Sequence, residues 1–393
     1  MSRIAGVRKW SPPHDIKLSE TLMETVKAAQ VTCTIYNPVT DTVLETLKAL
    51  DVREYHLQPS RAVVLKRRTG FLGIGAGIVL EEEPADKILF YVALADAKAA
   101  VQALAAACSL NIPGHGSAVY EEVEIGLGSA WEEHPLTPVP GTESVLTEEN
   151  LASLTCTVQR GRGDRIVKSV LGLGVPMPHV TTGEGTGLRE KLGLIRVTIP
   201  SGKDVVHAVA SEHEATEILG SLVDTARLDR FGSGFIYESP IAGGVVNNMV
   251  IRGQRHSASI EQLIGAVDKL MGSTDWRKRS LGGDDPTKRH KYLHELVSLN
   301  LICNEGRAGD LVRAALAAGA GGATISKARH AHMNGAVTPI SAAREMTDLI
   351  IGKDMVDDIA ASLEAAGVFD EEAAGFIAVK PVAVACTHPF VDR

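Results

Sequence analysis

The middle of the chain holds two glycine-rich segments of the kind that can bind an anion. The first, GEGTG at residues 183–187, precedes Arg189, and the second, GSG, occupies residues 232–234. Glycine reaches φ > 0 without strain, so consecutive backbone amides in such loops can point at a phosphate or carboxylate. No Lys-Ser or Lys-Thr follows the first segment, so it is not a P-loop, and ordinary β-turns remain the alternative. The residues expected to contact a ligand here are Gly183, Gly185, Thr186, Gly187, Arg189, Gly232, Ser233 and Gly234.

Basic residues recur near the corresponding turns in three parts of the chain. Guanidinium groups form paired, charge-assisted hydrogen bonds with carboxylates and phosphates, so several of them around one loop suit a small anion. A solvated protein surface is the alternative for each of these residues. The cations expected to take part are Arg160 and Arg162 in the middle of the chain, Arg307, Lys327 and Arg329 near its end, and Lys66, Arg67 and Arg68 near its start.

Two histidines offer a metal-binding or catalytic alternative. His330 and His332 alternate in the segment RHAHMN, and on an extended backbone both imidazoles point to one side, where His388 could complete a metal site. Exposed loop histidines are the competing interpretation, and His179, His207 and His213 are treated as isolated. The chain has no G-x-S-x-G or H-E-x-x-H motif. A hydrolase or metal enzyme that uses His330 and His332 is therefore kept as the second hypothesis, behind a regulatory binding protein.

The elements that must position these residues recur three times along the chain. Residues 151–240 show the order strand, helix, strand, strand, helix, strand, and residues 296–385 and 30–125 repeat it. The aspartates of the first turns align as Asp41, Asp164 and Asp310. Cys33 and Cys156 stand at the same distance before the first two of these aspartates, which supports the alignment.

This order predicts an α+β fold of three tandem ferredoxin-like domains, each with a four-stranded antiparallel sheet and two helices on one face. Three such sheets can pack face to face around an approximate threefold axis, so we expect a pseudo-trimer within one polypeptide, alone or in a higher assembly. The expected divisions are an N-terminal arm (1–29), domain 1 (30–125), a linker (126–150), domain 2 (151–250), a helical and charged linker (251–292) and domain 3 (293–393).

Four segments resemble the PII signalling-protein superfamily of nitrogen regulators. They are GLGVPMPHVTTGEGTG with RLDRFGSGFIYESPI in the middle copy, NIPGHGSAVYEEVE in the first copy, and GAGGATISKARH in the last. The resemblance implies ligand clefts between neighbouring units, bounded by the base of a T-loop and a Gly-x-Gly turn, which adds Gly114 and Gly116 to the expected site. It also implies an adenine nucleotide (ATP, ADP or AMP) as effector and a transporter, enzyme or regulator as the protein partner of the T-loops. Ser117 and Phe235 replace the basic residue that follows this turn in the family.

Composition narrows the partners further. The 393 residues are 45% hydrophobic and 22% charged, which is typical of globular domains, and the formal net charge of −8 argues against nucleic acid as a partner. A small anionic metabolite and a protein remain as the expected partners. Five scattered cysteines with no C-x-x-C pair argue against a disulfide framework and a thiolate zinc site. The sequence shows no signal peptide and no apolar run long enough to span a bilayer, so we expect a cytoplasmic protein.

Overall fold

The structure is a computed structural model. It describes residues 24–68, 77–112, 115–129, 131–186, 202–228, 230, 232–246, 251–252, 290–332 and 342–387. For residues 65–68, 77–80 and 251–252 it describes the backbone alone.

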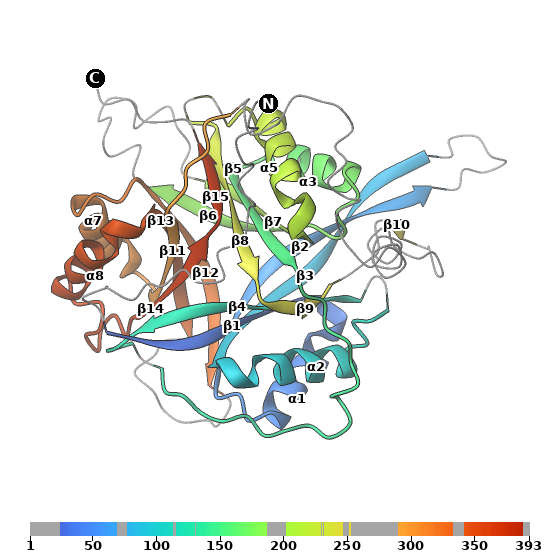
Figure 1. Cartoon of the computed structure of the whole chain (residues 1–393), viewed down its shortest axis with the longest axis horizontal. Helices are drawn as coiled ribbons and strands as arrows, with labels where there is room; N and C mark the ends of the chain where they lie inside the picture. Colours follow the sequence, from blue (N-terminus) through green and yellow to red (C-terminus); the bar gives the residue numbers. More distant parts are fainter. Residues whose placement is uncertain are drawn as a thin grey trace, which may run out of the picture.

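Each third of the chain contains the element order strand, helix, strand, strand, helix, strand (Figure 1). The first third consists of β1 (Thr25–Tyr36), α1 (Thr40–Ala49), β2 (Glu54–Arg68), β3 (Gly77–Ala93), α2 (Ala97–Ala107) and β4 (Gly116–Gly126). The middle third consists of β5 (Leu151–Gln159), α3 (Gly163–Gly172), β6 (His179–Thr186), β7 (Gly202–Ser211), α5 (Glu212–Ala226) and β8 (Gly234–Ile241). The last third consists of β11 (Leu296–Asn304), α7 (Ala308–Ala317), β12 (Ala323–His332), β13 (Ala343–Gly352), α8 (Val356–Ala365) and β14 (Phe376–Val382). Three short strands complete the set: β9 (Gly243–Val245), β10 (Ile251–Arg252) and β15 (Val384–Thr387).

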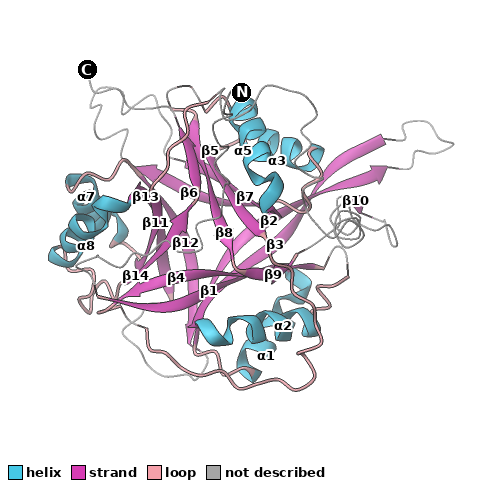
Figure 2. Cartoon of the chain, viewed as in Figure 1, coloured by secondary structure: helices cyan, strands magenta, loops and turns pink. Residues whose placement is uncertain are grey.

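The first helix of each third begins beside the aspartate by which the three repeats are aligned. Asp41, Asp164 and Asp310 stand in the first turns of α1, α3 and α7, where a carboxylate interacts favourably with the unpaired amides of the helix N-terminus. The helices pack in pairs, α1 with α2, α3 with α5 and α7 with α8, on the outside of the sheet (Figure 2). No helix in the described ranges is both long and apolar enough to cross a membrane.

Alternation along the strands decides which side of the sheet is apolar. In β5, Leu154 and Cys156 belong to the core beneath α3 and α5, whereas Ser153, Thr155 and Thr157 face the other way. β1 repeats this pattern, with its apolar residues beneath α1 and α2, and β11 does so beneath α7 and α8. Because successive side chains of a strand point to opposite faces, the three helix-covered cores lie outside the sheet and polar side chains line its inside.

The predicted fold class, three ferredoxin-like α+β domains forming a pseudo-trimer, is wrong. The sheets do not remain separate, because strands of different thirds hydrogen-bond along their edges. β4 pairs with β14, β12 pairs with β2 and β6, and β2 pairs with β6. The result is a closed antiparallel barrel of nine strands, in the order β2-β3-β1-β4-β14-β11-β13-β12-β6 and back to β2, with six further strands attached, of which β9 pairs with β4. β7, β5, β8 and β15 continue from β6, and β10 lies parallel to β2.

The expected linker at residues 126–150 is held against the first third. Leu136, Val139 and Val145 pack on the core beneath α1 and α2. The Gln102 amide of α2 donates to the carbonyl oxygens of Glu143 (3.1 Å) and Val145 (2.8 Å). The segment is therefore a strap across one helix pair. The arm at 1–29 and the linker at 251–292 lie mostly outside the described residues.

Candidate functional site

The glycine-rich segment of the middle third forms a strand where a loop was expected. Gly183, Gly185 and Thr186 belong to β6, which pairs with β12. A Cβ at Gly183 would stand 2.9 Å from the carbonyl oxygen of Ile325, so the missing side chain allows two strands to approach each other. The Thr186 hydroxyl donates to the carbonyl of Ala323 at 3.4 Å. These groups serve the contact between the middle and last thirds.

The Gly-x-Gly turns have a structural role. Gly116 and Gly234 begin β4 and β8 with φ of 141° and 134°, and a Cβ on Gly234 would stand 2.0 Å from the carbonyl oxygen of Thr157. Gly232, also at positive φ, accepts a hydrogen bond from the Gln159 amide at 3.3 Å. The backbone amide of Ser233, a buried residue, donates to the carbonyl of Arg230 at 3.2 Å.

Carboxylates of the protein itself accept hydrogen bonds from the backbone amides of the first β–α turns in the middle and last thirds. One Asp204 oxygen accepts hydrogen bonds from Gly161 N (2.8 Å) and Gly163 N (3.0 Å). Glu345 does the same for Gly306 N and Ala308 N, each at 3.0 Å. The predicted cations beside these turns therefore flank anion positions that are already filled.

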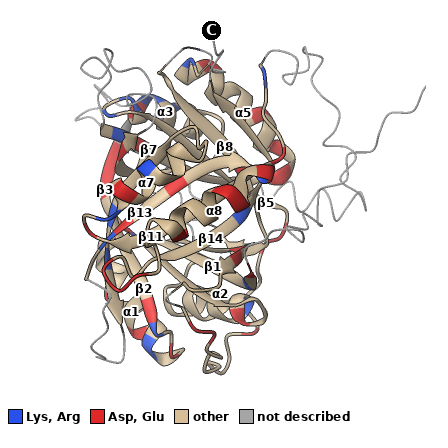
Figure 3. Ribbon diagram, turned by 90° about the vertical axis from the view of Figure 1, so that its left-hand side faces the viewer, with Lys and Arg blue, Asp and Glu red and all other residues tan. Residues whose placement is uncertain are grey.

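The predicted cations whose side chains the structure describes are exposed or half-buried, and two of them pair with carboxylates of the protein. Arg160, Arg162 and Arg329 are exposed. Arg307 forms an ion pair with Glu372 at 3.4 Å, and Lys327 pairs with Glu305. Acidic and basic residues are interspersed along the elements of this side of the molecule (Figure 3). Gly114, Gly187, Arg189 and His388 lie outside the described residues, and Lys66, Arg67 and Arg68 are described as backbone of β2 alone.

His330 and His332 lie in strand β12, at its seam with β2, and not in a loop. His330 stands opposite His56 with ring centroids 5.2 Å apart, and His332 stands opposite Glu54. The Glu54 carboxylate lies 3.5 Å from His330 Nε2 and 3.8 Å from His332 Nε2. Across the described part of the chain, no three His, Cys, Asp or Glu side chains are grouped so that they could hold a metal ion.

The polar inside of the sheet encloses a cavity of about 120 Å³. Its walls come from all three thirds, and hydroxyl and amide groups on β1, β5 and β12 line much of it. The titratable residues that face this cavity are Lys87, Glu121, His179, His207, Tyr237, Asp348 and Lys380. We therefore treat this cavity as the candidate site.

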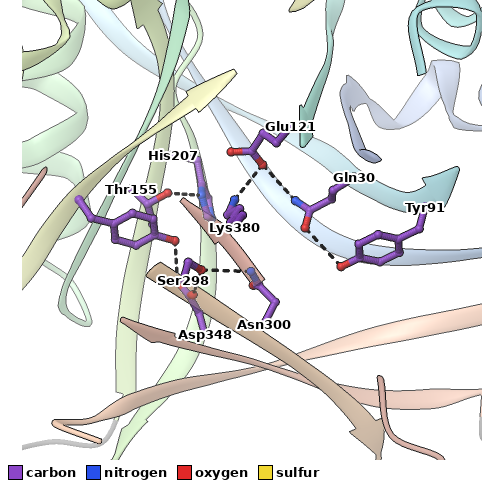
Figure 4. A network of polar contacts seen from close by, with 10 residues as sticks. Gln30, Tyr91, Glu121, Thr155, His207, Ser298, Asn300, Asp348 and Lys380 are labelled. Atoms are coloured by element: carbon purple, nitrogen blue, oxygen red, sulfur yellow. Dashed lines mark hydrogen bonds and ion pairs between the residues drawn. The ribbon is translucent and has the colours of Figure 1, made fainter. Parts of the chain in front are cut away.

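One buried network in the cavity is built around Glu121 of β4. A single Glu121 oxygen, Oε2, accepts hydrogen bonds from Lys380 Nζ at 2.8 Å and from Gln30 Nε2 at 3.1 Å (Figure 4). Tyr91 donates to the Gln30 side-chain oxygen at 3.2 Å. Burial, and then the Glu121 charge, raises the pKa of Tyr91. Lys380 and Glu121 thus neutralise each other across the boundary between the last and first thirds.

A second network surrounds Asp348 of β13. Tyr237 donates to Asp348 Oδ2 at 2.5 Å, Ser298 donates to Oδ1 at 2.6 Å, and Asn300 donates to the Ser298 hydroxyl at 3.1 Å (Figure 4). Burial and the Asp348 carboxylate raise the pKa of Tyr237 well above its ordinary value. The phenol therefore stays protonated and keeps donating to the aspartate at neutral pH.

Two histidines that the sequence interpretation treats as isolated stack inside the cavity. The rings of His179 and His207 lie 4.8 Å apart with an interplanar angle of 18°. His207 has the Thr155 hydroxyl 3.4 Å from Nδ1 and the Thr181 hydroxyl 3.2 Å from Nε2. Burial, followed by the Lys87 charge, lowers the pKa of His207 far below its usual range and that of His179 to about 3. Both rings are therefore neutral at pH 7, and each offers one donor and one acceptor nitrogen.

Lys87 is the cation of the cavity that has no contacting acid. Within the described ranges no side chain or carbonyl forms a hydrogen bond or an ion pair with its ammonium group. Burial, and then the neighbouring Lys380, lowers the pKa of Lys87 to about 8, against the opposing influence of Glu121 and Asp348. The partly buried ammonium group faces the cavity and contacts no acid among the described residues.

The sequence contains a signal for this site that the motif search overlooks. Lys87 stands in DKILFYVA, His207 in VVHAVA, Asp348 in TDLII and Lys380 in FIAVKPV, each a titratable residue within an apolar strand segment. Burying such a group is costly unless it finds a partner, so several of them in one chain indicate a shared polar interior.

No protein-family model matches the chain, and the search of curated proteins finds no match. The resemblance to the PII superfamily therefore stays a prediction.

Proposed function

We propose that the protein binds a small organic anion in the interior of its barrel, with Lys87 as the counter-charge. The observation that carries this proposal is the Lys87 ammonium group, which is partly buried, faces the cavity and contacts no acid among the residues that the structure describes. A carboxylate placed beside it would replace the lost hydration with a charge-assisted hydrogen bond. The bound anion would also raise the pKa of Lys87, because an opposite charge favours the ammonium form.

The cavity limits the size of the ligand. A cavity of about 150 Å³ accepts a ligand of roughly six non-hydrogen atoms, and the present one measures about 120 Å³. Short carboxylates fit this space, whereas the expected adenine nucleotide does not. Of Thr155 and Thr181, the one that accepts from the His207 N–H keeps its own hydroxyl proton for a remaining oxygen of such a ligand.

We further propose that ligand occupancy is communicated through the strands β2, β6 and β12. These strands pair with one another at one place in the barrel, and each contributes side chains to the cavity wall: Gln58, His179 and Thr324 respectively. They also precede in the chain the segments that the PII resemblance implies to be T-loops, parts of which lie outside the described residues. A partner protein that recognises those segments would thereby sense the ligand.

Thermal unfolding with a panel of small anions tests the binding proposal. Formate, acetate, propionate and glycolate are compared with chloride at equal ionic strength, using the parent chain, Lys87→Met and Lys27→Met. Lys27 is an exposed residue of β1 and serves as the matched control. Ligand at 100-fold over its dissociation constant stabilises the folded state by about 2.7 kcal/mol, which such a measurement resolves.

We expect at least one carboxylate to raise the melting temperature of the parent chain and of Lys27→Met, but not that of Lys87→Met. Amide hydrogen exchange with the same anion should slow in β2, β6 and β12. An equal shift in all three proteins would place the anion elsewhere, and no shift with any anion would overturn the proposal.

A further inference from the structure

The surroundings of Lys87 suit bond formation as well as ion pairing. Its amine faces the cavity, and no described group holds its nitrogen lone pair or its protons in a hydrogen bond. A second cation, Lys380, stands close enough to lower its pKa, and Lys87 in turn stands close enough to lower the pKa of His179 and His207. A lysine that is desolvated and lies beside another cation is the usual arrangement of a nucleophilic amine.

The geometry points to Lys87 as an amine that reversibly captures a small 2-oxo acid as an imine within the barrel. This inference rests on the proposed function and specifies its ligand class, because a 2-oxo acid carries both the carboxylate and a carbonyl carbon. The cavity of about 120 Å³ restricts the acid to a few carbons, of which glyoxylate and pyruvate are the simplest examples.

The reaction needs no oxidant, reductant or further reactant. The lone pair of the Lys87 nitrogen attacks the carbonyl carbon, a C–N bond forms, and the C=O π electrons move to the oxygen. A proton passes from nitrogen to that oxygen to give a carbinolamine, which then expels its hydroxyl group as water, with one added proton, to leave the protonated imine. The iminium ion retains the positive charge of the former ammonium group, so the carboxylate of the acid keeps its counter-charge.

Neutral proton carriers line the same cavity. His179 Nε2 is buried with no described hydrogen-bond partner, and the His207 ring lies stacked against it. A neutral imidazole both donates and accepts a proton, as the passage from amine to carbinolamine to imine requires. The lowered pKa of Lys87, about 8, leaves about one amine in ten neutral at pH 7, roughly 300-fold more than for an ordinary lysine.

Reductive trapping tests the inference. The full chain is incubated at pH 7 with glyoxylate or pyruvate and cyanoborohydride, and alkylated lysines are located by peptide mass mapping. We expect alkylation of Lys87 at least tenfold faster than that of the exposed Lys27, and no reaction when lactate, which has no carbonyl, replaces pyruvate. Carbon NMR with pyruvate labelled at its carbonyl carbon provides a readout that needs no reductant, since the imine carbon gives its own signal.

Two variants separate failure of this inference from failure of the proposed function. Lys87→Arg keeps the positive charge but has no nucleophilic amine, so it should still be stabilised by acetate while the imine signal disappears. Lys87→Met should lose both. If the parent chain is stabilised by acetate but shows neither faster labelling of Lys87 nor an imine signal, imine formation is refuted and anion binding stands. If acetate and the oxo acids all leave the parent chain unchanged, both proposals fail.

Discussion

Replacing Lys87 with methionine should stabilise the protein at neutral pH. The pKa of Lys87 is lowered from 10.5 to about 8, so its protonated form is disfavoured in the folded state relative to the unfolded state. At 1.36 kcal/mol per pKa unit this amounts to about 3 kcal/mol. Methionine has a similar length and no charge, so the Lys87→Met variant should gain up to this free energy of unfolding at pH 7.

The pH dependence of this gain follows from proton linkage. Between pH 8 and 10.5 the unfolded chain holds a proton at Lys87 that the folded chain has lost, so the free energy of unfolding of the parent rises with pH in this window. The variant lacks this rise. Its advantage should therefore be greatest below about pH 8 and should vanish above about pH 10.5.

Denaturant unfolding of the parent chain and of Lys87→Met, measured at intervals from pH 6 to 10.5, gives the difference in their free energies of unfolding. Cys33 and Tyr91 also contribute to the pH dependence of unfolding, because burial raises their pKa values in the folded state above those of the unfolded state. Their contributions cancel in the difference between parent and variant at each pH. Lys27→Met, at an exposed position of β1, is the matched control. A Lys87→Met variant that is less stable than the parent by the same amount at every pH would refute the assignment of Lys87 as an uncompensated cation.

Three further changes test other parts of the structure. Lys380→Met leaves the buried Glu121 carboxylate without its ion-pair partner and should lower the free energy of unfolding by about 3 kcal/mol; Glu121→Gln in the same chain should recover part of this loss, and no recovery would count against the pair. Gly234→Ala should lower the free energy of unfolding by more than about 2 kcal/mol, because the added Cβ would overlap a carbonyl oxygen. Gly161→Ala, at φ 85° but with open space around it, should lower it by only about 1 kcal/mol. Equal losses for the two variants in denaturant unfolding would contradict the contact at Gly234. Burial raises the pKa of Glu238 from 4.5 to about 7, so the folded state binds an extra proton and the free energy of unfolding should fall as pH rises between these values. The Glu238→Gln variant should lessen this fall by up to about 3 kcal/mol in unfolding measurements. A pH profile that the substitution leaves unchanged would refute the raised pKa of Glu238.

Local patterns predicted the elements but not how they join. The segments around Asp41, Asp164 and Asp310 form helices in the order that the sequence indicates, because helix starts and apolar spacing are local properties. Pairing between thirds depends on which edges meet in space. The pairing of Ala378 with Ile125 joins strands far apart in the chain and leaves no local periodicity. Local patterns therefore predict three separate sheets where the protein closes one barrel.

The same limit applies to the candidate site: local sequence features identify single residues but not how they come together. The sequence indicates glycine-rich segments and arginines as the site, yet Gly183 and Gly185 are part of strand β6, and Asp204 and Glu345 accept hydrogen bonds from the turn amides beside Arg162 and Arg307. The cavity residues belong to no motif. Their chemistry arises because closure of the barrel brings Lys87 and Asp348, which are distant in sequence, to one interior. A titratable side chain in an apolar strand identifies such residues individually, but not their common location.

The protonation equilibrium of Lys87, followed by carbon NMR in protein with labelled lysine, tests the central claim most directly. Lys87→Arg identifies its signal by the disappearance of one resonance. We predict titration near the lowered value of about 8 without a ligand, and a higher midpoint in saturating acetate, because the bound carboxylate stabilises the ammonium form. Titration near the ordinary value of 10.5, unmoved by any small carboxylate, would contradict the account.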